Sequence, residues 1–215
     1  MARSATERSA IDQPLAGGIA SAAILANAFF VGGVLMGFEM LGSRYLFPYF
    51  GGGIGTWAGL ISTVLAALTI GYFVGGSFVD RYPSLRIIAV ACALAAAYLA
   101  LVPLAADPTM SWILDHLGYG PAGILTAAAA LLLVPLSFLG TFSPVAVRLL
   151  LRSTHQTGRI AGLVYGVSTI GNIAGTLFTT FTLIPTIGSR AITYLFAGVL
   201  AVAALSMLLV SRSAR

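Results

Sequence analysis

Long apolar stretches, separated by short polar ones, fill almost the whole chain. A helix needs roughly 20 apolar residues to cross about 30 Å of hydrocarbon. Charge-free intervals of that length run over 13–38, 45–79, 87–106, 117–147, 160–189 and 191–211. None reaches the ~40 residues that two spans require, so the pattern predicts one span in each. We expect an all-α integral membrane protein, a single domain over 1–215 with six transmembrane helices at about 16–40, 55–79, 87–106, 121–143, 160–185 and 191–211.

The composition agrees with this pattern. Hydrophobic residues make up 59% of the 215 residues and charged residues only 8%, far outside the usage of soluble domains. All eleven basic residues are arginines, and the net charge of +5 bears on orientation in a membrane, not on nucleic acid. A lipid bilayer is the expected partner.

The arginines predict the orientation. With six spans and the N-terminus inside, nine arginines lie on the cytoplasmic side and only Arg44 and Arg190 lie outside. Short cytoplasmic loops carry such an excess, so both termini are expected in the cytoplasm, at a bacterial inner membrane. Residues 1–14 form an expected cytoplasmic tail before a retained first helix, because the apolar run that follows is longer than a signal-peptide core.

The longest predicted outer loop lies between the third and fourth spans. Its Trp112, Ile113 and Leu114 favour a short interfacial helix. It is the only extramembrane piece of any size, so we expect no soluble catalytic domain. No spacing in the chain assembles a nucleophile with a base, or two carboxylates, and the protein is predicted not to be an enzyme and to need no cofactor.

Cysteine and histidine offer no predicted metal site. Cys92 is the single cysteine and sits in an apolar run, where a small core side chain is the simplest interpretation. His116 and His155 lie in different predicted loops and lack the spacing that places two imidazoles on one helix face. Gly51–Gly55 follows no strand, so it indicates a turn, not a phosphate loop.

Glycines four residues apart recur within the spans. This spacing places both glycines on one helix face and lets two helix backbones approach closely. Packing inside the bundle and packing between two copies are both open interpretations. The pairs are Gly33 and Gly37, Gly71 and Gly75, Gly162 and Gly166, and Gly171 and Gly175.

Two features place polar groups among apolar ones. Glu39 and Arg44 lie near the outer end of the first span, and on a continuous helix they point about 140° apart, so each needs another partner. Thr179, Thr180 and the outer-loop acid Asp107 are expected at a suitable depth. We expect Glu39→Gln to destabilise the fold. The fifth span carries a polar stripe, which is expected to face the bundle interior or a wet cavity and to serve either packing or a substrate path. Its members are Tyr165, Ser168, Thr169, Asn172, Thr176, Thr179 and Thr180.

A loop motif follows the second span. Gly76-x3-Asp80-Arg81, followed by Arg86, is similar to the motif between the second and third helices of the major facilitator superfamily. Tyr82-Pro83-Ser84 stands where that motif has glycine and basic residues. The alternative is a simple turn with charged groups at two helix ends.

A short internal similarity points in the same direction. Gly55–Ile61 in the second span resembles Gly158–Val164 in the fifth, as in transporters built from repeated units. This predicts two three-helix units that resemble half of a major facilitator fold.

Taken together, the motifs resemble the membrane region of the fused major-facilitator/spermidine-synthase-like proteins, from about residue 31 to 190. In that family a soluble aminopropyltransferase-like domain commonly follows the membrane helices, and this chain ends at Arg215 without it, so synthase activity is not implied. The motifs are Glu39-x4-Arg44-x3-Pro48-x-Phe50-Gly51-x5-Trp57, the Gly76 loop, and Gly158-Arg159 leading to Thr169-x-Gly171-Asn172-x2-Gly175-Thr176 and Leu183-Ile184-Pro185.

Two functions follow as hypotheses. The first is a non-catalytic membrane subunit or scaffold, in a homo-oligomer or in a hetero-complex with another membrane protein. The alternative is a transporter-like protein that binds or moves a small organic cation such as a polyamine, at Glu39 and the polar stripe of the fifth span.

Overall fold

The computed structural model describes residues 18–151 and 156–213. The predicted tail 1–14, the first two residues of the first predicted span, and Arg3, Arg8, Arg152, His155 and Arg215 lie outside these ranges.

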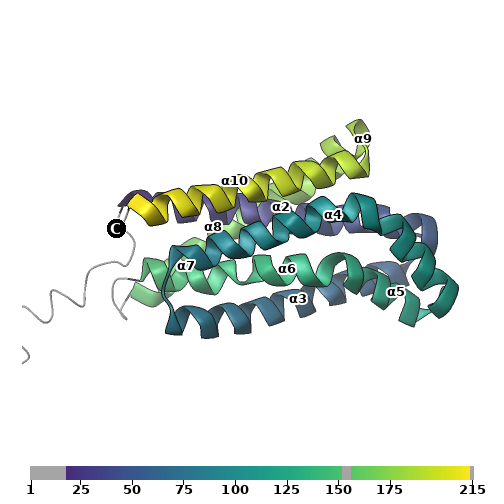
Figure 1. Ribbon diagram of the computed structural model, residues 1–215, viewed down its shortest axis with the longest axis horizontal. Helices are drawn as coiled ribbons and strands as arrows, with labels where there is room; N and C mark the ends of the chain where they lie inside the picture. The colour runs from purple at the N-terminus through teal and green to yellow at the C-terminus, as the bar shows by residue number, and fades with distance from the viewer. Residues whose placement is uncertain (1–17, 152–155, 214–215) are drawn as a thin grey trace, which may run out of the picture.

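Within the described residues, the chain forms six helical spans and no strand, which confirms the predicted all-α class (Figure 1). All six are long and apolar enough to cross a membrane. Three are single helices: α2 (Gly18–Phe50), α3 (Ile54–Arg81) and α4 (Leu85–Leu117). The fourth consists of α5 (Pro121–Ala128), η1 (Ala129–Leu133), α6 (Val134–Gly140) and α7 (Phe142–Leu150); the fifth of α8 (Thr157–Phe178), η3 (Thr179–Leu183) and α9 (Ile184–Thr186); the sixth is α10 (Ser189–Ser213).

The third span is longer than predicted. We expected a loop with a separate short helix after residue 106, and this was wrong, because α4 continues to Leu117 through Pro103 and Pro108. The continuation has a buried face, with Met110 and Ile113 almost inaccessible. It ends at Gly118, whose φ of +68° is a conformation that glycine adopts easily.

Two spans contain a π-helical turn directly before a proline. η1 precedes Pro135 and η3 precedes Pro185. Proline lacks an N–H group and its ring clashes with the carbonyl four residues earlier. The wider turns cover that earlier residue in both spans, so the helices continue past their prolines without breaking.

Helix α2 is central to the packing: it contacts α8 most extensively and also packs on α10, while α4 packs along α10 and α3 along α6. Glycines allow two of these approaches. A Cβ on Gly175 would meet the backbone of Gly33, and one on Gly75 would lie 2.7 Å from the Cα of Thr141. These seams depend on dispersion between closely packed backbones, as in other membrane bundles.

A buried hydrogen bond links the first and sixth spans. The hydroxyls of Tyr45 and Thr193 lie 2.8 Å apart, and the Thr193 hydroxyl also donates to the carbonyl of Ser189. Asn27 makes a second link between the same spans, because its amide donates to Ser206. Such bonds hold α10 in a defined register against α2.

Candidate functional site

A small polar pocket lies among four of the six spans. It is lined by α2, α3, the junction of α6 and α7, and α8, and its volume is about 50 Å³. The polar side chains on its wall are Tyr72, Ser143, Ser168 and Asn172. This volume has room for a few water molecules. It is far below the roughly 300 Å³ of sites that enclose a drug-sized molecule.

Asn172 reaches the pocket because α8 crosses α2 at a glycine. A Cβ on Gly32 would lie 2.8 Å from the Asn172 Oδ1 atom and 3.0 Å from the Ser168 hydroxyl. The Asn172 Oδ1 atom is buried and accepts no hydrogen bond within the described residues. An orphaned acceptor costs about 1–3 kcal/mol in such a setting. The pocket is therefore suited to a donor, either water or an N–H group.

Glu39 lies on the pocket side of α2, three residues beyond Met36 and seven beyond Gly32, which is one helix face. The residue is only 7% exposed. No described residue forms a hydrogen bond or ion pair with it. Thr179 and Thr180, which we expected to serve as partners at this depth, are themselves buried without hydrogen bonds from their hydroxyls. The first span thus contains an isolated acid.

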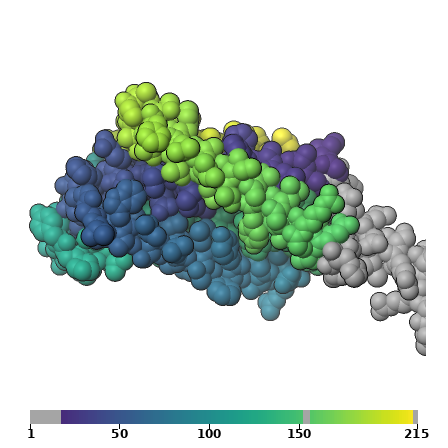
Figure 2. All heavy atoms as spheres, turned by 180° about the vertical axis from the view of Figure 1, so that it is seen from behind, coloured from purple at the N-terminus to yellow at the C-terminus, as the bar shows by residue number. Residues whose placement is uncertain are grey.

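The polar stripe of the fifth span divides into two parts. Ser168 and Asn172 face α2 and the pocket, and the Thr176 hydroxyl donates to the backbone carbonyl of Asn172. Tyr165 and Thr169 lie instead on the exposed side of α8. The expectation that the stripe faces the interior holds for the first part and for the buried hydroxyls of Thr179 and Thr180. It fails for Tyr165 and Thr169, because α8 lies at the edge of the bundle (Figure 2).

The predicted glycine pairs also divide. Six of the eight glycines pack against a neighbouring helix: Gly33, Gly37, Gly71, Gly75, Gly171 and Gly175. In contrast, a Cβ on Gly162 or Gly166 would meet no neighbouring atom within 4 Å. These two glycines of α8 do not pack inside the described bundle.

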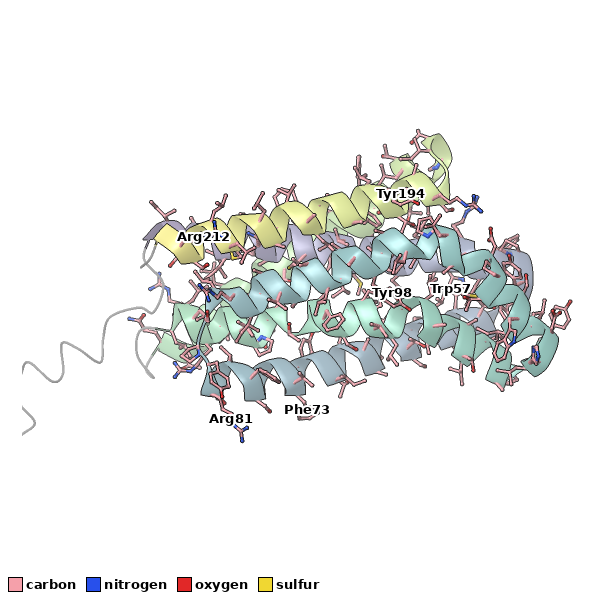
Figure 3. All side chains as sticks on the ribbon, viewed as in Figure 1. Trp57, Phe73, Arg81, Tyr98, Tyr194 and Arg212 are labelled. Atoms are coloured by element: carbon pink, nitrogen blue, oxygen red, sulfur yellow. The ribbon has the colours of Figure 1, made fainter. Side chains whose placement is uncertain are left out.

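Apart from Glu39, the charged groups that the structure describes lie at the two ends of the bundle. Arg81 and Arg212 lie at one and the same end (Figure 3). The Asp80 carboxylate of the Gly76 loop motif forms an ion pair at 3.7 Å with Arg148, and both side chains are exposed. At the other end, Arg44 is exposed and lines a cleft with Asp107 and Arg190.

Several polar residues of the structure escaped sequence reasoning. Tyr72 and Ser143 join the pocket from spans that were read as apolar. Asn27 could have been recognised from the sequence, because it is a single amide in an apolar stretch and an amide in lipid needs a hydrogen-bond partner. The pairing of Tyr45 with Thr193 depends on contacts between the first and last spans, which no local pattern reveals.

Among the described residues, no group of three histidine, cysteine or acidic side chains is placed to hold a metal ion. No protein-family model, curated protein or solved structure matches this chain.

Proposed function

We propose that the protein is a non-catalytic subunit of a membrane complex, and that α8 packs against a transmembrane helix of a different membrane protein. One observation carries this proposal. In the most apolar window of the fifth span only 11% of the residues are buried, against 39% to 50% in the other five. Figure 2 shows that α8 crosses this face of the molecule with no other helix lying over it.

The exposed side of α8 carries a run of glycines at the spacing that lets two helices pack closely. Gly158, Gly162 and Gly166 recur at intervals of four, and none of them has a neighbour within 4 Å of a built Cβ. Beyond them the same side carries bulky residues, with Ile173 and Leu177 about half exposed. Exposed glycines next to bulky apolar residues favour contact with another helix that carries small residues, because glycines at this spacing let two helix backbones approach closely.

Hydroxyl groups on that side favour protein over lipid as the covering material. The side chains of Tyr165 and Thr169 are exposed on α8, and neither forms a hydrogen bond within the described residues. Lipid tails offer no acceptor or donor. A neighbouring helix supplies both, so covering this face with protein satisfies groups that lipid leaves unsatisfied.

Short connections support a role inside the membrane. The described turns between spans cover only residues 51–53, 82–84, 118–120 and 187–188. Most of the described surface is therefore that of the spans themselves, which favours an interaction within the membrane.

Mild extraction from the native membrane followed by native mass spectrometry tests the proposal. We expect the chain to travel with a second membrane protein in fixed stoichiometry. A lone monomer, or a homodimer without a second protein, contradicts it.

A second candidate is a transporter-like protein that binds a small organic cation. It is favoured by the isolated Glu39 carboxyl and the unpaired Asn172 oxygen on one side of α2. The pocket of about 50 Å³ is too small for a polyamine in this arrangement, so a wider state is required. For this candidate we also propose that the chain is related to the fused major-facilitator/spermidine-synthase-like proteins. Proteoliposome uptake that is unchanged in Glu39→Gln counts against it.

We further propose that both termini lie in the cytoplasm, at a bacterial inner membrane. The support is the charge bias, because Arg81, Arg86, Arg148, Arg159 and Arg212 belong to the helix ends nearest the C-terminus. A fluorescent protein fused to the C-terminus is expected to fluoresce in bacteria, while alkaline phosphatase fused at the same place stays inactive. Active phosphatase at the C-terminus contradicts this orientation.

A further inference from the structure

A cleft of about 380 Å³ opens at the end of the bundle opposite to Arg81 and Arg212. Its walls come from the end of α2, from α4, and from the turn that leads into α10. Three charged residues line it, Arg44, Arg190 and Asp107, with Tyr45 and Tyr49 beside them. Elements far apart in the sequence thus place two arginines on the wall of one cleft.

The single carboxylate of the cleft is already occupied. Arg190 donates to one oxygen of Asp107 at 2.6 Å, and the Tyr49 hydroxyl donates to the other at 3.3 Å. Arg44 has no carboxylate partner and no hydrogen-bond acceptor among the described residues, although its side chain is exposed at the same cleft. The cleft therefore carries one uncompensated positive charge.

Backbone groups add to this field. Gly188 and Ser189 line the cleft at the start of the 25-residue helix α10. The first N–H groups of a helix have no intrahelical acceptor and carry partial positive charge. These N–H groups contribute less than the two arginines, but they too favour a negatively charged ligand.

The placement of the arginines runs against the charge bias of the rest of the chain. Of the seven arginines that the structure describes, only Arg44 and Arg190 belong to this end, and both line the cleft. Orientation in the membrane is not helped by arginines at this end. A local role explains them better, since a guanidinium group offers paired N–H donors that match a phosphate group.

We propose that this cleft binds a phosphate group. Arg44 is the principal ligand, and Arg190, which is paired with Asp107, is a second cationic group of the same cleft. Two sources share that chemistry: the headgroup of an anionic phospholipid in the adjacent leaflet, and a free phosphate compound. The ion pair with Asp107 holds the Arg190 side chain at the wall of the same cleft that Arg44 lines.

The test compares Arg44→Gln with Arg212→Gln, an exposed arginine at the far end. In one arm, the purified protein is placed in nanodiscs with equal amounts of phosphatidylglycerol and phosphatidylcholine. It is then released from the nanodiscs in the mass spectrometer, and native mass spectrometry counts the lipids that stay bound. In the other, inorganic phosphate is titrated calorimetrically in a neutral detergent. Circular dichroism melting of each variant checks that it folds like the wild type.

We expect wild-type protein and Arg212→Gln to retain phosphatidylglycerol or bind phosphate, and Arg44→Gln to bind about tenfold more weakly, the loss of one charge-assisted contact. Retention of phosphatidylglycerol alone identifies a lipid headgroup, and phosphate binding identifies a soluble ligand. Absence of binding in both arms overturns the proposal. Equal weakening in Arg44→Gln and Arg212→Gln overturns it as well.

Discussion

Gly175→Leu is expected to lower the free energy of unfolding by about 3 kcal/mol, at the upper end of the cost of overpacking. The reason is geometric: a Cβ at this position meets the backbone of Gly33 on α2. A flexible side chain can move aside, but a helix backbone cannot move without separating α8 from α2. Equilibrium unfolding in mixed micelles, followed by circular dichroism, measures the change.

Gly162→Leu is the matched control in the same helix. No neighbouring atom lies within 4 Å of a built Cβ at Gly162, so its stability is expected to stay within about 0.5 kcal/mol of the wild type. Loss of the partner protein without loss of stability is the predicted result for this variant. Equal destabilisation by both substitutions contradicts the assignment of Gly175 to a packed seam and of Gly162 to an open one.

Glu39→Met is expected to raise the free energy of unfolding by about 1–3 kcal/mol, because burial of a polar group without a partner costs that much. Methionine has a similar volume and no group to satisfy. This reverses our expectation from the sequence, which supposed partners for Glu39 that the described residues do not provide. Thermal unfolding of the purified variant in detergent measures the effect.

Two controls separate the causes. Glu39→Ala removes the carboxyl group but leaves a cavity, so it is expected to be less stable than Glu39→Met. Glu39→Gln keeps a polar group of the same size and is expected to change stability little. A Glu39→Met variant that is less stable than the wild type contradicts the account, because it means that the carboxyl group takes part in a stabilising interaction.

Spacing of charges was enough to predict the six spans, because the length of a span follows from membrane thickness. The boundary at residue 106 failed for a physical reason. Asp107 and Pro108 are end signals for a helix, yet α4 continues because Met110 and Ile113 are buried by tertiary contacts. Local signals cannot predict a continuation that contacts from other spans stabilise.

The candidate site was predictable only in part. Asn172 stood out as an amide in mid-span, but the pocket also needs Tyr72 and Ser143, and their meeting depends on how four spans pack. The glycine spacing predicted close helix packing, but it did not indicate which glycine pairs contact no neighbouring helix of the described bundle. Gly162 and Gly171 follow the same spacing rule, and only their position around α8 distinguishes an exposed face from the seam with α2.

Site-specific photo-crosslinking in the native membrane tests the role of α8 most directly. A photoreactive residue at Gly162 is compared with one at Leu101, which is 61% exposed on α4. Helix α4 lies on the face of the bundle that Figure 1 shows, and α8 lies on the opposite face, which Figure 2 shows. We predict that Gly162 crosslinks to one other membrane protein, the same one that copurifies with the chain, while Leu101 crosslinks to lipid. Crosslinking of Gly162 to lipid alone, or to a second copy of the chain alone, contradicts the proposal that α8 packs against a different protein.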